Sequence, residues 1–116
     1  MFRFPTPDNA TFVMIDMQQK LLPAMHNPDA VLARMGLLLD GLNTLEVPVV
    51  VTEQYPAGLG ATVPELADRL PEYAPVLPKT EFSCFGAEGF DAALDLAARP
   101  VLILAGIEAH VCVQQT

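Results

Sequence analysis

Three side chains in this sequence could together perform acid–base and nucleophilic chemistry: a carboxylate at Asp16, an ammonium at Lys79 and a thiol at Cys112. A carboxylate can accept the proton of a thiol, and a nearby ammonium can stabilise the resulting thiolate. Each residue also has an ordinary interpretation. Cys112 could be a small buried hydrophobe, Asp16 could cap a turn, and Lys79 could be a solvated surface side chain. The chemical interpretation therefore depends on whether the fold brings the three residues together.

The elements that would position these residues follow from the hydrophobic pattern. Apolar runs predict strands, and segments with one apolar face predict helices. The expected strands are residues 11–17, 48–52, 76–79 and 101–105, and the expected helices are residues 28–45, 62–70 and 90–98. Residues 53–62 are expected to form a loop. Strands that alternate with helices predict an α/β fold, with a parallel sheet covered by helices on both faces in a Rossmann-like three-layer α/β/α arrangement.

Sites in such sheets form at the carboxyl ends of the strands. Asp16, Lys79 and Cys112 each lie at or just past the end of an expected strand, so the sheet could bring them to one edge. Cys112 is expected in the first turn of a helix, where the helix N-terminus would favour a thiolate. His110 lies two residues before Cys112. Their side chains would point apart on a helix, so His110 is not expected to act as the base.

Composition limits the classes of function. The chain has 116 residues, 52% of them hydrophobic, and a net charge of −8. Its six basic residues are scattered, whereas nucleic-acid binding needs clustered positive charge. No apolar stretch approaches the roughly 20 residues of a transmembrane helix, and no secretory signal is visible. We therefore expect no nucleic-acid or membrane partner, a cytoplasmic location and free thiols.

Four strings carry a resemblance to a known family: FVMIDMQQKLL, VVVTEQYPAGLGATVPEL, KTEFSCFG and LAGIEAHVCVQQT. They are similar to the isochorismatase-like cysteine hydrolases, above all to the isochorismatase domain-containing proteins, from about residue 10 to the end. The resemblance implies a catalytic triad of Asp16, Lys79 and Cys112. Cys112 would attack the carbonyl carbon of a small amide-like substrate, and water would hydrolyse the thioester. Asp16 would carry the proton, and Lys79 would hold Asp16 and stabilise the thiolate.

The resemblance also implies an oxyanion hole and a substrate pocket. A non-proline cis peptide bond would join Ile107 to Glu108, although such a bond costs roughly 3 kcal/mol and needs surroundings that enforce it. The backbone N–H groups of Glu108 and Cys112 would then form the oxyanion hole. The aromatic residues of two loops could line the pocket or close onto the core; they are Tyr55, Phe82 and Phe85.

Cofactors and partners follow from the same resemblance. Nicotinamidases of this superfamily bind a metal through an Asp and histidines, but the corresponding segment here, TEQYPAGLG, has no histidine. We therefore expect no metal and no cofactor. The expected partners are a small-molecule substrate and, because relatives are commonly oligomeric, further copies of the full-length chain.

The resemblance further implies that residues 1–116 form a single isochorismatase-like hydrolase domain that lacks its C-terminal third. The isolated chain is then expected to be unstable or inactive. Two other classes of function stay open. The fold could be retained as a catalytically silent interaction or dimerisation module. Alternatively, Cys84 and Cys112 could form a thiol-redox pair, although they lack CxxC spacing. Otherwise Cys84 is expected to pack in the core.

Overall fold

A four-stranded parallel sheet forms the centre of the computed structural model, which describes residues 3–116. Its strands are β1 (Ala10–Ile15), β2 (Val49–Gln54), β3 (Val76–Lys79) and β4 (Val101–Gly106). Their order across the sheet is β3-β2-β1-β4, and every neighbouring pair is parallel. The carboxyl ends of all four strands therefore lie at the same edge of the sheet.

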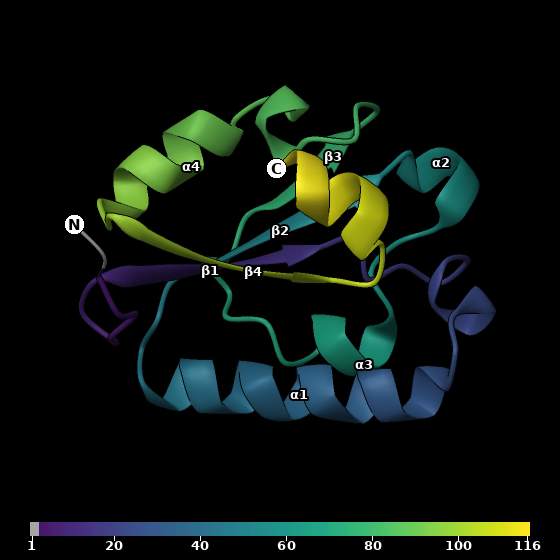
Figure 1. Cartoon of the computed structure of the whole chain (residues 1–116), viewed down its shortest axis with the longest axis horizontal. Helices are drawn as coiled ribbons and strands as arrows, with labels where there is room; N and C mark the ends of the chain where they lie inside the picture. The colour runs from purple at the N-terminus through teal and green to yellow at the C-terminus, as the bar shows by residue number, and fades with distance from the viewer. Residues whose placement is uncertain (1–2) are drawn as a thin grey trace.

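Helices cover both faces of this sheet (Figure 1). The elements between and after the strands are η1 (Leu22–Ala24), α1 (Pro28–Thr44), α2 (Pro56–Leu59), α3 (Pro64–Ala67), η2 (Cys84–Gly86), α4 (Phe90–Ala97) and the π-helical turn η3 (Ala109–Val113). Helices α1 and α3 lie on one face, and α4 and the C-terminal turn lie on the other (Figure 1). The predicted α/β class with a doubly covered parallel sheet is thus confirmed.

The residues of β1 explain why its sequence is apolar throughout. Phe12 and Met14 are buried in the cluster that packs against α1. Val13 and Ile15 are buried in the opposite cluster, with Phe90 of α4. Successive side chains of a strand point to opposite faces, so a strand covered on both sides shows a continuous apolar run rather than alternation. Strand β1 is therefore a central strand of the sheet.

Several element boundaries differ from the sequence prediction, and β1, expected at 11–17, ends at Ile15. Strand β2 extends to Gln54, because its parallel pairing with β3 continues to the pair Gln54 and Lys79. The segment expected to be loop contains the short helix α2, and the helix expected at 62–70 is only α3 (Pro64–Ala67). Polar residues at the end of β2 conceal the strand in the sequence. They belong to the sheet because β3 satisfies their backbone groups.

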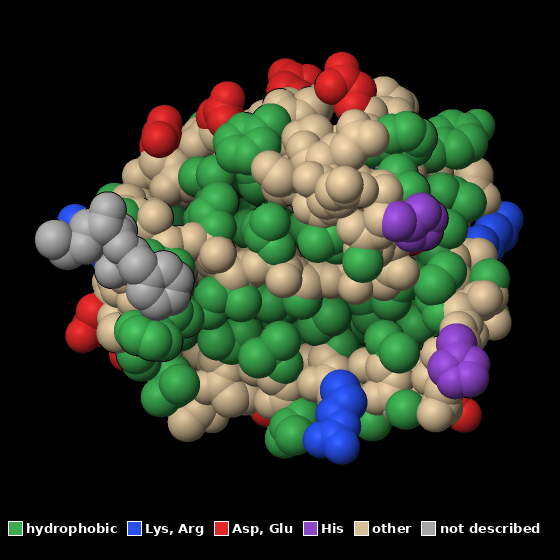
Figure 2. Space-filling model, in the orientation of Figure 1, with side chains coloured by type: hydrophobic (Ala, Val, Ile, Leu, Met, Phe, Trp, Pro, Cys, Tyr) green, Lys and Arg blue, Asp and Glu red, His purple; other side chains and the backbone are tan. Residues whose placement is uncertain are grey.

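The two edges of the sheet differ in character. Strand β3 is short and contains Pro78, which cannot donate a backbone hydrogen bond. Strand β4 is longer, its sequence is VLILAG, and each of its residues is partly exposed. Figure 2 shows hydrophobic side chains gathered on the face where β4 runs in Figure 1. No helix in the described part of the chain is long and apolar enough to cross a membrane.

Candidate active site

Asp16 is the first residue after β1, and its carboxylate is almost completely buried, with 1% of the residue exposed. Its backbone adopts the left-handed conformation, with φ of 56°. Asp tolerates that region better than most residues do. One carboxylate oxygen, Oδ2, accepts a hydrogen bond from Lys79 Nζ at 2.9 Å, and the other, Oδ1, accepts one from Thr52 Oγ1 at 2.9 Å. Both oxygens of a buried carboxylate are thus hydrogen-bonded.

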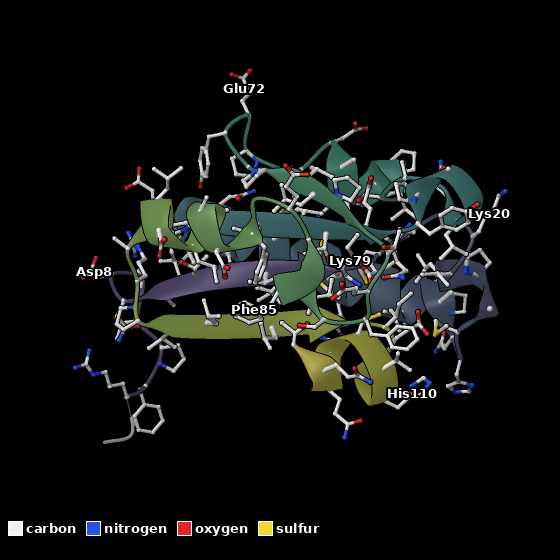
Figure 3. The ribbon with its side chains drawn as sticks, turned by 90° about the horizontal axis from the view of Figure 1, so that it is seen from above. Asp8, Lys20, Glu72, Lys79, Phe85 and His110 are labelled. Carbon is white, nitrogen blue, oxygen red and sulfur yellow. The ribbon has the colours of Figure 1, made fainter. Side chains whose placement is uncertain are left out.

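Lys79 is the last residue of β3, and its side chain is completely buried. Besides Asp16, its ammonium donates to the side-chain oxygen of Gln54 at 2.6 Å. It also donates to the backbone carbonyls of Glu81 and Phe82 at 3.1 Å and 3.0 Å. Figure 3 shows Lys79 in the interior. A buried ammonium needs such compensation, because desolvation of an unpaired charge is costly.

Cys112 lies in the turn η3 that follows β4, and only 1% of the residue is exposed. Its Sγ is 3.6 Å from Lys79 Nζ. The structure therefore brings the three expected side chains together, from the ends of β1 and β3 and from the turn after β4. His110 of the same turn is exposed and lies on the outside of the molecule (Figure 3).

The Cys112 thiol does not have the environment expected for a thiolate. Burial, a hydrogen bond with Asp16 and the negative charge of Asp16 together raise its pKa from 9.0 to about 12. The charge of Lys79 lowers the pKa, but this effect is smaller, and the charge of Glu108 raises it further. The raised pKa runs against the thiolate that a helix N-terminus would favour. The turn is only five residues long, and the thiol is next to a carboxylate.

The peptide bond between Ile107 and Glu108 is another correction. No cis peptide bond occurs among residues 3–116, so the cis bond expected between Ile107 and Glu108 is wrong. This segment is only partly buried, and Ala109 and His110 after it are exposed. A segment that is partly open to solvent is constrained on one side only, and a cis bond needs surroundings that enforce it. The backbone oxyanion hole at Glu108 and Cys112 stays a prediction.

The three aromatic residues expected near the site are each about half exposed. The ring of Tyr55 lies against Gly58, and the ring of Phe85 packs edge-to-face on Phe90 with centroids 5.0 Å apart. Phe82 contributes its carbonyl to Lys79. A role for these rings in binding substrate stays a prediction. An apolar cavity of about 540 Å³ lies beside α4, lined by Tyr73 and Leu96 among others, and no residue of the triad lines it.

Sequence reasoning missed the contribution of β2 to the site. Thr52 and Gln54 hold Asp16 and Lys79, respectively. Gln18 in turn holds Gln54: its Nε2 donates to the Gln54 carbonyl at 2.8 Å, and its Oε1 accepts from the Gln54 N–H at 2.6 Å. The available signal was position, because Thr52 and Gln54 lie at the carboxyl end of the strand between β1 and β3. Alternate residues of this strand end point toward the site.

Comparison with known proteins identifies the family. Residues 10–116 match the family model described as Isochorismatase domain. The chain therefore belongs to the isochorismatase family, and this membership together with the fold supports a hydrolase function. The resemblance carried by the four sequence strings is thus confirmed.

Individual relatives agree with this family. Isochorismatase domain-containing protein 1 from Salmo salar is 39% identical over 110 residues, which cover 95% of this chain and 38% of that protein. The structure of the MAR1 ribonuclease from Caenorhabditis elegans matches with a TM-score of 0.85 at 38% identity, over 96% of this chain and 57% of that chain.

A third relative is the YcaC gene product from Escherichia coli, described as an octameric hydrolase of unknown specificity. It matches with a TM-score of 0.85 at 26% identity, over 97% of this chain and 56% of that chain. The chain thus spans between 38% and 57% of the length of these three proteins. The activity of the whole protein is therefore treated below as a proposal.

Proposed function

We propose that the complete protein is a cysteine-dependent hydrolase that cleaves the C–N bond of a small amide-like substrate. The observation that carries this proposal is the buried contact among Asp16, Lys79 and Cys112, in which Lys79 Nζ is 2.9 Å from Asp16 Oδ2 and 3.6 Å from Cys112 Sγ. A nucleophile, a base and a charge that fixes the base are the parts that covalent hydrolysis needs. Family membership supports the same class of reaction.

The reaction would begin when Cys112 Sγ attacks the carbonyl carbon of the substrate. Asp16 takes the thiol proton during this attack and then passes it to the leaving amine as the C–N bond breaks. The acyl group is left on sulfur as a thioester. Water then attacks the thioester while Asp16 accepts a proton from it. When the C–S bond breaks, that proton returns to sulfur and a carboxylic acid is released.

The raised pKa of Cys112, about 12, favours one form of the first step. Burial and the neighbouring Asp16 disfavour a preformed thiolate, so proton transfer to Asp16 would accompany the attack rather than precede it. Lys79 then serves mainly to hold Asp16 in reach of the thiol. Its positive charge also favours negative charge as it develops on sulfur.

The alternatives fit the chain less well. The ribonuclease name of the Caenorhabditis elegans relative would require binding of a polyanion, but this chain has a net charge of −8. The one ammonium in the site, that of Lys79, is already occupied by oxygen acceptors. The thiol-redox alternative needs a bond between the two cysteines, which are both free thiols in this structure. A silent interaction module would have no reason to keep a buried ion pair beside a thiol.

Assembly and location form part of the same proposal. We expect the complete protein to form a homo-oligomer, because the related YcaC gene product is described as octameric. We expect no cofactor, since the three proposed catalytic residues supply the nucleophile and the proton transfers. A cytoplasmic location suits two free buried thiols, because a reducing compartment keeps thiols from pairing.

The decisive experiment screens the complete protein against a panel of small amides and measures ammonia release. Cys112→Ala is expected to lower turnover at least about a thousandfold, because it removes the nucleophile. Quenched reactions of the unaltered protein should contain an acyl adduct on the peptide that carries Cys112, measured by mass spectrometry. Turnover that survives in Cys112→Ala would rule out the proposed nucleophile. A protein that neither turns over any amide nor forms an adduct with an activated ester would favour the silent module.

A further inference from the structure

Thr52 and Cys84 form a buried hydrogen-bonded pair directly behind Asp16, and the proposed reaction does not use them. Both residues are 0% exposed. Thr52 Oγ1 is 2.9 Å from Asp16 Oδ1 and 3.6 Å from Cys84 Sγ. Cys84 belongs to η2, and Thr52 belongs to β2. Cys84 of η2 thus contacts Thr52 of β2, which in turn contacts the Asp16 oxygen that Lys79 does not bind.

Proton counting gives these hydrogen bonds a direction. A carboxylate can only accept, so the single hydroxyl proton of Thr52 is donated to Asp16 Oδ1. That hydroxyl has no second proton to give to sulfur. The Cys84 thiol must therefore be the donor across the 3.6 Å contact with Thr52 Oγ1. The chain of donors runs from Cys84 through Thr52 to Asp16.

Cys84 is also connected to the nucleophile through its backbone. The Cys84 N–H donates to Thr116 Oγ1 at 3.0 Å, and Thr116 Oγ1 donates to the carbonyl of Cys112 at 2.7 Å. One residue is therefore linked through its side chain to the base and through its backbone to the turn that carries the nucleophile. A movement of Cys84 would change both ends of the proton transfer.

We propose that Thr52 and Cys84 are positioning residues that hold Asp16 Oδ1 both before and after Asp16 takes the thiol proton. This inference rests on the proposed function. When Asp16 is ionised, the hydroxyl of Thr52 donates to it. When Asp16 holds the thiol proton on its other oxygen, Oδ1 still accepts from the Thr52 hydroxyl, so the proton stays available for the leaving amine. Cys84 keeps its own proton, so no proton leaves the pair.

The competing explanation is that Cys84 is simply a small buried hydrophobe. It does pack in the apolar cluster that includes Phe90 and Cys112. The two explanations differ in what a serine does at this position. Cys84→Ser keeps a group that can donate and accept, whereas Cys84→Ala removes it, and both replacements are smaller than cysteine. If only packing matters, the polar serine should be the worse of the two substitutions.

Thr52 has a matched control residue, Thr11, on the neighbouring strand β1. Thr52→Val replaces a buried hydroxyl by a methyl group of similar size. Thr11 of β1 is also 0% exposed, but its Oγ1 has no hydrogen-bond partner in the described part of the chain. Thr11→Val therefore makes the same chemical change in the same sheet without touching Asp16.

The test measures the rate at which iodoacetamide alkylates Cys112 in the complete, folded protein at pH 8, with peptide mass spectrometry to separate Cys112 from Cys84. Thr52→Val should slow alkylation about tenfold, because Asp16 loses the hydrogen bond that holds it in position to take the thiol proton. Cys84→Ala should slow it less, by about threefold for a weak thiol donor, and Cys84→Ser should recover most of the rate. Thr11→Val should leave the rate unchanged.

Turnover of an amide, where one is found, should follow the same order in kcat with little change in KM. Equal alkylation rates in Cys84→Ala and the unaltered protein would overturn the inference, as would a serine variant slower than the alanine variant. If Cys84→Ala does not fold, the comparison of Thr52→Val with Thr11→Val still decides. A protein that keeps the alkylation contrast but hydrolyses no amide would reject the proposed function and leave the positioning role standing.

Discussion

Replacing Asp16 by asparagine tests the idea that a buried ion pair holds the site. Asp16→Asn keeps the shape of the side chain and removes its charge. Asp40 provides a matched control, because it forms an ion pair of similar length with Arg69, at 2.7 Å instead of 2.9 Å. The two pairs differ in burial: the side chains of Asp40 and Arg69 are 57% and 42% exposed, and those of Asp16 and Lys79 are 1% and 0% exposed.

The expected loss of stability follows from that difference. At 2.9 Å and an effective dielectric constant of about 20, the gross attraction between Asp16 and Lys79 is about 6 kcal/mol. Breaking a buried pair by removing one partner costs about 3–5 kcal/mol, since the remaining charge stays buried. Lys79 keeps three other oxygen acceptors, so we expect the lower end, about 3 kcal/mol. Asp40→Asn should cost less than about 1 kcal/mol, because water screens its pair.

Urea unfolding of the complete protein, followed by circular dichroism at pH 7 and a fixed protomer concentration, measures both values. The double variant with Asp16→Asn and Lys79→Met should be more stable than the sum of the two single changes, because it leaves no unpaired charge. If Asp16→Asn costs no more than Asp40→Asn, the pair is solvated in solution and the reasoning is wrong. Additive single changes would lead to the same conclusion.

Two further predictions concern the thiol and the sheet. Because the folded-state pKa of Cys112 is about 12 against an ordinary value of 9.0, its stabilisation is complete below about pH 9 and is lost as the pH rises toward 12. The loss in unfolding free energy should be about 2 kcal/mol by about pH 10.5 in the unaltered protein, and Cys112→Ser should not show it. Parallel pH profiles of the unfolding free energy in the two proteins would contradict this expectation. Gly106→Ala should lower stability by about 2 kcal/mol, because its Cβ would lie 2.7 Å from the Ile15 carbonyl oxygen. Gly41→Ala in α1, where nothing lies within 4 Å, should instead stabilise by about 0.5–1 kcal/mol, and equal melting temperatures for these two variants would refute the steric argument.

The fold was largely predictable because the sequence of its central strand, β1, is diagnostic. The continuous apolar run of β1 could be satisfied only by a sheet covered on both faces, and alternation with helices then required parallel strands. The end of β2 was not predictable in the same way. Glu53 and Gln54 are polar and carry no hydrophobic period, so their strand character comes from pairing with β3, which lies far along the chain.

The site was predictable in its members but not in its chemical state. The ends of strands gave the positions of Asp16, Lys79 and Cys112, since parallel strands present their carboxyl ends at one edge. The ionisation of Cys112 depends on burial and on the distance to Asp16, which are properties of the assembled molecule. The trans bond between Ile107 and Glu108 likewise depends on local packing. A sequence motif specifies neither the ionisation of a thiol nor the conformation of a peptide bond.

The separation of the triad along the chain explains why the site should report on the whole sheet. Lys79 contacts Asp16 across 63 residues and Cys112 across 33, and the two contacts together span the whole β3-β2-β1-β4 sheet. No local segment can hold these groups, because each comes from a different strand end. The buried ion pair is favourable only when that whole edge excludes water. Loss of any strand pairing should therefore solvate the pair and free the thiol from Asp16 together, so that the reactivity of Cys112 becomes a probe of sheet integrity.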